Sequence, residues 1–173
     1  KGIAIEGTAV LAREMAGPLA ASVGPELVQR SRRFLKEPGI SVVPDAMIAC
    51  RAGRPHAMHD PTEGGLATGL WELAHASGKR LLIDLEAVHV YPETAAFCRA
   101  LELDPVGLIA SGSLLIAAAP EYSALIVSAL AREGISAAVI GKAVEGSPSV
   151  QMRTSRGLEP MPIFEQDELT RVF

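Results

Sequence analysis

Aromatic residues and cysteines are both scarce in this 173-residue sequence. Aromatic side chains make up only 4% of it, so the core has to be built from aliphatic residues, which favours layered helices and strands over an aromatic-rich β-sandwich. The two cysteines, Cys50 and Cys98, stand far apart, and no histidines cluster with them. We therefore expect no disulfide framework and no structural zinc site, and we predict two plain buried thiols.

Long apolar runs and strong charge of one sign are also lacking. No apolar run approaches the roughly 18 residues that a membrane helix needs, and no signal-peptide pattern opens the sequence. The net charge of −4 comes without a basic stripe, which argues against nucleic acid as a main partner. These observations predict no membrane or nucleic-acid partner and a reducing, cytoplasmic setting.

What the chain does have is a large hydrophobic content. Hydrophobic residues make up 49% of it and the mean hydropathy is +0.26, values that are typical of a globular protein. No repeat or linker stands out, so residues 1–173 are predicted to form one domain, which buries roughly 70% of its unfolded surface. Residues 1–5 begin in the middle of a pattern and without methionine. We expect the sequence to be a fragment whose preceding part is missing.

A loop at residues 60–65 separates a short apolar run from an amphipathic helix. Pro61 fixes its own φ and pushes the preceding residue out of the α region, so the strand has to end there. The side chain of Asp60 or Thr62 can then cap the helix by accepting a hydrogen bond from a backbone N–H that has no helical partner.

Two glycines, Gly64 and Gly65, complete this loop. Without a Cβ they allow another backbone or a ligand to come close, although each costs about 1 kcal/mol in a helix interior. The free N–H groups of a helix start attract anions, typically by about 0.3–1 kcal/mol for an exposed charge. Two interpretations stay open, a well-capped strand-to-helix turn and an anion-facing loop.

Hydrophobic periodicity predicts alternating helices and strands along the chain. The predicted helices cover residues 5–15, 25–36, 44–51, 66–77, 93–101 and 121–133, with a terminal helix at 164–173. The predicted strands cover residues 56–59, 81–85, 114–118, 139–144 and 150–153. We expect Gly17-Pro18 to end the first helix, Leu125 to point inward, strand 114–118 to be buried on both faces, and the last two strands to pair. This order of elements predicts a mixed sheet with helices packed against it.

Residues 58–66, with the sequence MHDPTEGGL, resemble the C-terminal domain of the aminoimidazole ribonucleotide (AIR) synthase, or PurM-related, superfamily. This superfamily includes the hydrogenase maturation factor HypE, thiamine-monophosphate kinase, selenophosphate synthetase and formylglycinamidine synthase. The similarity covers nearly the whole chain and includes Gly2-Ile3-Ala4, Ala12-Arg13-Glu14, Leu103-Asp104-Pro105 and Ala110-Ser111-Gly112. It implies a three-layer α+β fold with a mixed sheet and a whole protein that forms a homodimer.

The resemblance also implies chemistry. Such proteins use ATP to activate an oxygen or to transfer a phosphoryl group, and their Mg²⁺-binding acidic residues lie mainly on an N-terminal domain that this sequence does not contain. By carry-over, the residues that would border a nucleotide or substrate cleft are Asp60, Thr62, Gly64 and Gly65, with Ser111 and Gly112 on a facing loop. No catalytic or metal-binding residue is predicted within the chain.

Two departures from the HypE pattern favour another AIR-synthase-related branch. HypE proteins end with a cysteine that receives a carbamoyl group, whereas residues 169–173 contain none. Ser111-Gly112-Ser113 also stands where HypE is expected to have a Glu-Gly-Lys-like sequence.

Three functions remain as hypotheses. The first is half of an ATP-dependent kinase or synthetase that acts on a phosphorylated small molecule or nucleotide. The second is a non-catalytic ligand-binding or dimer-forming module, and the third is a HypE-like maturation factor that works through a protein partner. His59 next to Asp60 is a conceivable acid–base pair, but neighbours on a strand point to opposite faces, so we expect a structural role.

Overall fold

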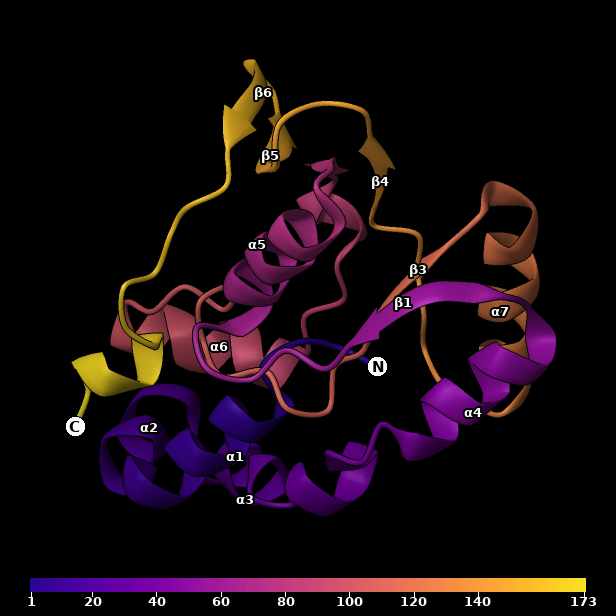
Figure 1. Ribbon diagram of the computed structural model, residues 1–173. Helices are drawn as coiled ribbons and strands as arrows, with labels where there is room; N and C mark the ends of the chain where they lie inside the picture. The colour runs from indigo at the N-terminus through magenta and orange to yellow at the C-terminus, as the bar shows by residue number, and fades with distance from the viewer.

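The computed structural model describes all residues, 1–173 (Figure 1). The α-helices are α1 (Ile5–Glu14), α2 (Ala16–Val23), α3 (Pro25–Ser31), α4 (Val43–Ala52), α5 (Gly65–Ser77), α6 (Pro92–Leu101) and α7 (Pro120–Arg132). The strands are β1 (Pro55–His59), β2 (Arg80–Ile83), β3 (Leu115–Ala118), β4 (Gly141–Val144), β5 (Ser149–Thr154) and β6 (Gly157–Pro160). Shorter helical turns cover Leu35–Gly39, Leu85–Ala87 and Glu168–Arg171.

The strands form two sheets. In the four-stranded sheet, in the order β4-β2-β5-β6, β2 pairs antiparallel with β4 and parallel with β5, and β5 pairs antiparallel with β6. β1 and β3 form a separate antiparallel ribbon. The predicted mixed sheet is therefore confirmed, but the structure divides the strands between a mixed sheet and a ribbon.

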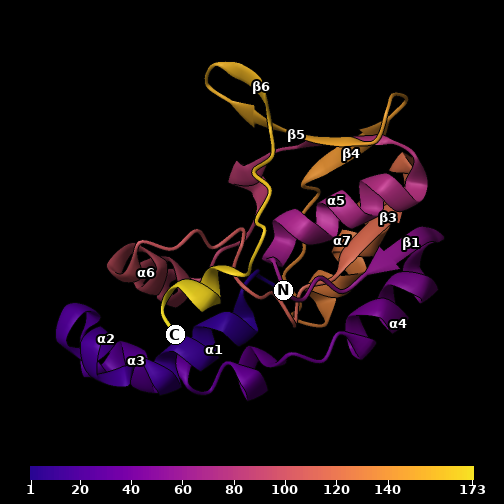
Figure 2. The same cartoon turned by 60° about the vertical axis from the view of Figure 1, so that its left-hand side comes forward.

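Three layers follow one another from the sheet downward (Figures 1 and 2). The four-stranded sheet lies at the top, α5 lies beneath it, and α6 lies with α1, α2 and α3 at the bottom. Leu66 and Leu70 of α5 share a core with Leu81, Ile83 and Val150 of the sheet. The predicted α+β fold of three layers is confirmed.

Two helices differ from their predicted bounds. The pair Gly17-Pro18 was expected to end a helix, but it lies near the start of α2, because proline is tolerated in a first turn, where its missing N–H has no helical partner. The helix predicted at residues 25–36 stops at Ser31, and the chain then turns so that Phe34 packs against Ile5 and Ala9. The predicted terminal helix is only the short turn Glu168–Arg171.

Strand pairing and one helix face also depart from prediction. β4 and β5 do not pair with each other but flank β2, whose Leu81 and Ile83 are buried and whose backbone is hydrogen-bonded on both edges. β3 was expected to be buried on both faces, but in a two-stranded ribbon it is mostly half-buried. Leu125, predicted to point inward, is exposed, because only Ile126 and Leu130 of α7 join the core shared with α4.

The first turn of α5 is placed by a close approach between two backbones. Gly65 has a φ of 65°. A Cβ on it would lie within 3.0 Å of the carbonyl oxygens of Val106 and Leu108. In the same region the Ala67 N–H donates to the Val106 carbonyl at 3.0 Å. Gly65 is therefore required by backbone packing.

Replacing Gly65 tests this constraint. Gly65→Ala is expected to reduce the free energy of unfolding by about 2–4 kcal/mol, because it adds left-handed strain to a clash with two carbonyl groups. Gly78→Ala is the matched control, since Gly78 also has a positive φ of 66° but nothing lies within 4 Å of its Cβ position. That control should cost only about 1 kcal/mol. Urea unfolding followed through Trp71 on α5 measures both, and equal losses would show that the close approach contributes nothing.

Candidate functional site

The two segments predicted to face one another are neighbours in the structure. Residues 60–65 join β1 to α5, and residues 109–113 precede β3. The carbonyl oxygen of Thr62 accepts hydrogen bonds from the N–H of Ala110 at 3.0 Å and from that of Gly65 at 3.1 Å. The loop after β1 is thus fixed to the loop before β3.

The predicted site residues divide into exposed side chains and buried glycines. Asp60 and Thr62 are exposed and Ser111 is half-exposed, so their oxygens can reach a ligand. Gly64 and Gly65 are buried. Gly112 is buried too, with a φ of 102° and with Ile5 and the backbone of residues 39–40 beside its Cβ position. These glycines shape the loops, and the side chains at the surface carry the polar groups.

The start of α5 is not capped as the sequence suggested. Its N-cap is Gly64, and no side chain caps it from that position, so the prediction of a cap by Asp60 or Thr62 is wrong. Instead, the N–H of Gly64 donates to Oδ2 of Asp167 at 2.8 Å. Gly64 is in the left-handed region, with a φ of 71°. The helix start therefore already holds a carboxylate supplied by the chain itself.

The segment that carries Asp167 is firmly attached. Oδ1 of Asp167 accepts from the N–H of Leu169 at 2.9 Å. The buried carboxylate of Glu168 accepts from the N–H of Asp104 at 2.7 Å and pairs with Arg171 at 2.8 Å. The contacts of Asp167 with Leu169 and of Glu168 with Arg171 are local, but Glu168 and Asp104 are 64 positions apart, so no local pattern in the sequence could have indicated that contact.

His59 has a different partner from the neighbour considered in the sequence. Its Nε2 lies 2.6 Å from Oε2 of Glu72, which projects from α5. The contact joins the end of β1 to α5 beside the loop, and Asp60 takes no part in it. Glu72 is 13 positions from His59, inside the helix predicted at residues 66–77. Its place on that helix was the only feature of the sequence that could have indicated this contact.

The two cysteines differ in environment. Cys98 of α6 is buried in the hydrophobic core. Its burial, with smaller contributions from Asp104 and Glu168, raises the pKa of its thiol to about 12. Cys50 on α4 is exposed, so the prediction of two buried thiols is wrong for Cys50. Cys98 is a neutral thiol at neutral pH and is not a nucleophile.

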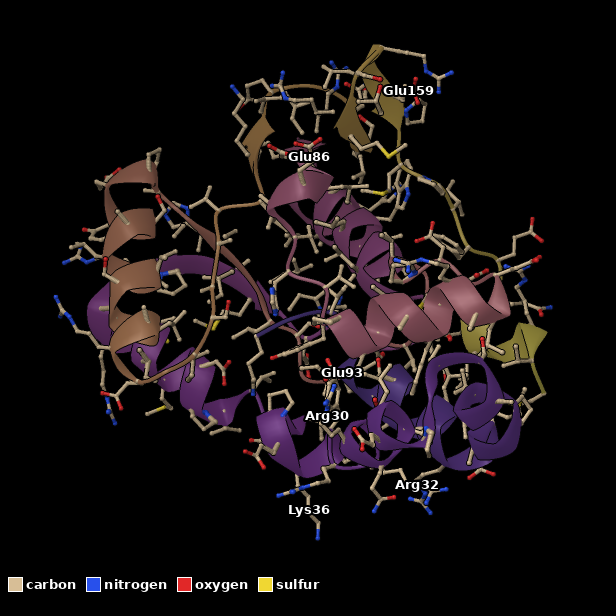
Figure 3. All side chains as sticks on the ribbon, turned by 180° about the vertical axis from the view of Figure 1, so that it is seen from behind. Arg30, Arg32, Lys36, Glu86, Glu93 and Glu159 are labelled. Atoms are coloured by element: carbon tan, nitrogen blue, oxygen red, sulfur yellow. The ribbon has the colours of Figure 1, made fainter.

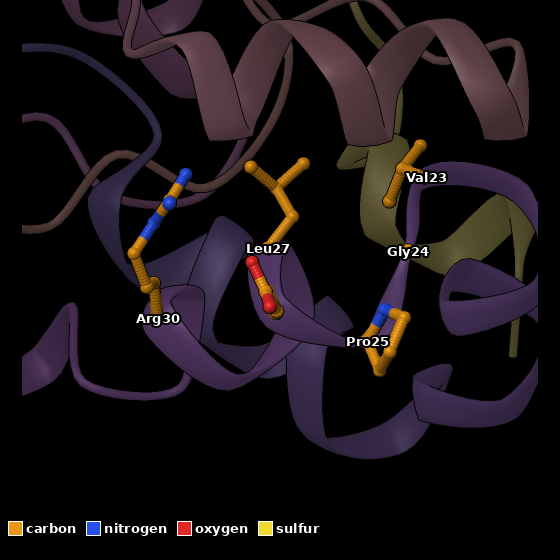
Figure 4. Close-up of a pocket in the computed structure, with 6 residues that line it drawn as sticks. Val23, Gly24, Pro25, Leu27 and Arg30 are labelled. Carbon is orange, nitrogen blue, oxygen red and sulfur yellow. The ribbon is translucent and has the colours of Figure 1, made fainter.

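Two surface hollows lie away from these loops. One of about 330 Å³ is lined by residues of α2 and α3, among them Val23, Leu27 and Arg30 (Figure 4). Arg30 pairs with Glu93 of α6 at 3.2 Å, and the two are close together in Figure 3. The second, of about 360 Å³, lies between α4 and α7.

Two further features of the chain concern side chains that could bind a metal ion and helices that could span a membrane. No group of three or more His, Cys, Asp or Glu side chains is arranged to hold a metal ion. None of the helices has both the length and the apolar composition needed to cross a bilayer.

Residues 1–153 match the family described as AIR synthase related protein, C-terminal domain. A carbamoyl dehydratase HypE from Rhizobium leguminosarum bv. viciae is 39% identical over 114 residues, which cover 64% of this chain and 33% of that protein. This chain thus spans about a third of the length of that relative.

Solved structures share the fold. A hydrogenase maturation protein HypE in complex with ATP has a TM-score of 0.71 at 24% identity, over 97% of this chain and 50% of that chain. A HypE–HypF complex has a TM-score of 0.54 at 25% identity, over 64% of this chain and 36% of that chain. The resemblance expected from residues 58–66 is confirmed, including its HypE-like character.

The carboxylate at the start of α5 can be tested directly. Asp167→Ala should lower the free energy of unfolding by about 1–2 kcal/mol, because it removes the acceptor of the Gly64 and Leu169 N–H groups. Glu165→Ala, at an exposed residue of the same segment, should change it by less than about 0.5 kcal/mol. Hydrogen exchange should show a faster Gly64 amide in the first variant only. An unchanged Gly64 amide would contradict the contact.

Proposed function

We propose, because this chain belongs to the family of AIR synthase related C-terminal domains, that it is the C-terminal half of an ATP-dependent enzyme of the HypE type. In this proposal residues 60–65 and 109–113 border a nucleotide or substrate cleft, and the rest of the cleft comes from an N-terminal domain. The whole protein is proposed to be a cytoplasmic homodimer.

The likeness to a carbamoyl dehydratase is the observation that carries the proposal. A relative with that name is 39% identical over most of this chain. It also favours the HypE-like alternative over the other branch that Ser111-Gly112-Ser113 suggested. Removing water from a carbamoyl group requires its oxygen to leave, and ATP supplies that chemistry by making the oxygen part of a phosphate.

The exposed oxygens of the two loops fit such a ligand. The hydroxyl groups of Thr62 and Ser111 make no hydrogen bond within the chain, so both can donate to phosphate oxygens. Asp60 presents an exposed carboxylate, which can accept hydrogen bonds from hydroxyl or amino groups of a ligand. The Gly64 N–H is already bonded to Asp167, so we assign ligand binding to these side chains and not to that amide.

The proposal that this protein binds ATP rests on its family. A structure with this fold is described as HypE in complex with ATP, and at 24% identity that likeness shows the shared fold. ATP with Mg²⁺, bound mainly by the N-terminal domain, is our proposal for this protein. A carbamoyl-carrying thiol, where the reaction uses one, is not Cys98, since burial keeps that thiol neutral.

Two alternatives have their own support. A protein partner is suggested by the related HypE that was solved in complex with HypF. A non-catalytic module is the alternative for a chain in which no catalytic residue is predicted from the sequence and in which the Cys98 thiol is neutral. Binding of Mg-ATP separates the enzyme from the module.

Calorimetric titration of Mg-ATP into the whole protein tests the proposal. The double variant Thr62→Val with Ser111→Ala should weaken binding by about a hundredfold, because each hydroxyl lost from a phosphate removes a hydrogen bond to a charged group and so costs about tenfold. Ser136→Ala is the matched control, since Ser136 is exposed in the loop after α7, far along the chain from either segment. Its affinity should equal that of the natural protein.

Two outcomes would contradict the proposal. Absence of Mg-ATP binding by the natural protein would favour the module. Binding that the double variant leaves unchanged would place the nucleotide away from residues 60–65 and 109–113.

A further inference from the structure

The surface formed by α4 and α7 exposes large apolar side chains. The two helices pack against each other through Ala49, Ile126 and Leu130. On the outside, Met47 of α4 is 50% exposed and Leu125 of α7 is 55% exposed. The core of this helix pair therefore uses only part of its apolar surface.

These side chains follow helical spacing. On α4, Val43, Met47 and Arg51 are four residues apart, so they lie along one face. On α7, Leu125, Ala129 and Arg132 repeat at intervals of four and three residues. Each helix thus presents an apolar stripe that ends in an arginine.

One groove, the α4–α7 groove, lies between the two helices, and it is the hollow of about 360 Å³. Ile48 and Ala52 of α4 line it together with Leu125 and Ala129 of α7. Arg51 and Arg132 also line it, and neither forms an ion pair within the chain. Glu133 is the single acidic residue of the lining, so the groove has an apolar floor and a net positive rim.

The groove stands apart from the proposed cleft. Figure 1 shows α4 and α7 next to the β1–β3 ribbon, at the end where β1 begins, whereas residues 60–65 follow the other end of β1. In the opposite view of Figure 3, α7 lies at the outer edge of the molecule. An occupant of the groove leaves residues 60–65 open.

We propose that the α4–α7 groove binds an acidic amphipathic helix of a partner protein. Its apolar stripe lies over Leu125 and Ile48, and its carboxylates pair with Arg51 and Arg132, in the manner of a helix held in a hydrophobic groove. A second copy of this chain fits less well, because a twofold contact through this face brings together two surfaces that both carry net positive charge.

Synthetic helical peptides serve as the probe in a fluorescence anisotropy titration with the whole protein. One peptide carries leucine at helical positions i, i+3, i+4 and i+7 with flanking glutamates. The second peptide keeps the same leucines and carries lysine in place of each glutamate. The glutamate peptide should bind at least about tenfold more tightly than the lysine peptide, and the preference should fall as salt rises.

Variants locate the binding. Leu125→Glu should weaken the glutamate peptide by about tenfold or more, because it places a carboxylate on the apolar floor. Val139→Glu is the matched control, since Val139 is similarly exposed, at 60%, but lies outside the groove, and it should have no effect. Arg51→Glu with Arg132→Glu should favour the lysine peptide.

Three results would overturn the inference. The first is that the two peptides bind equally well or that neither binds. The second is that Leu125→Glu does not weaken binding of the glutamate peptide. The third is that Leu125→Glu converts a dimer to a monomer in sedimentation. The last result would show that a second copy occupies the groove. None of these results depends on whether the protein binds Mg-ATP.

Discussion

Gly65 has no room for a side chain because the backbone of residues 106–108 passes directly beside its Cα. This one close approach determines where the first turn of α5 lies, and the hydrogen bonds from Ala67 to Val106 and from Ala110 to Thr62 continue the contact on both sides. Two loops that are about 50 residues apart in the chain are thereby held as neighbours, with their hydroxyl and carboxylate groups at the surface. The same placement brings the Gly64 N–H within reach of Asp167.

The electrostatics of this helix start differ from those of an open anion site. A helix N-terminus attracts negative charge, and here the chain satisfies that attraction with the carboxylate of Asp167. Glu168, buried beside it, fixes the segment through the N–H of Asp104. In the proposed cleft, a ligand would therefore meet the side chains of Thr62, Ser111 and Asp60 and not the Gly64 amide, which is already bonded.

Local signals allowed much of this region to be predicted from the sequence. Pro61 indicated the end of β1, the glycines indicated the turn, and the spacing of Leu66, Leu70 and Ala74 indicated α5. Tertiary packing decided the rest. Asp167 lies 103 positions from Gly64, so no pattern joins them. Leu125 has the spacing of a core residue, but α4 covers only one side of α7 and leaves it exposed.

Hydrogen–deuterium exchange of the whole protein with and without Mg-ATP tests directly whether the loops at residues 60–65 and 109–113 bind the nucleotide. It is suited to this question because it reports on each loop separately. We predict slower exchange at residues 60–68 and at residues 109–113 when the nucleotide is bound, since both segments border the proposed cleft. Exchange in the α4–α7 groove should not change. Nucleotide-dependent protection that leaves both loops unaffected would contradict the account.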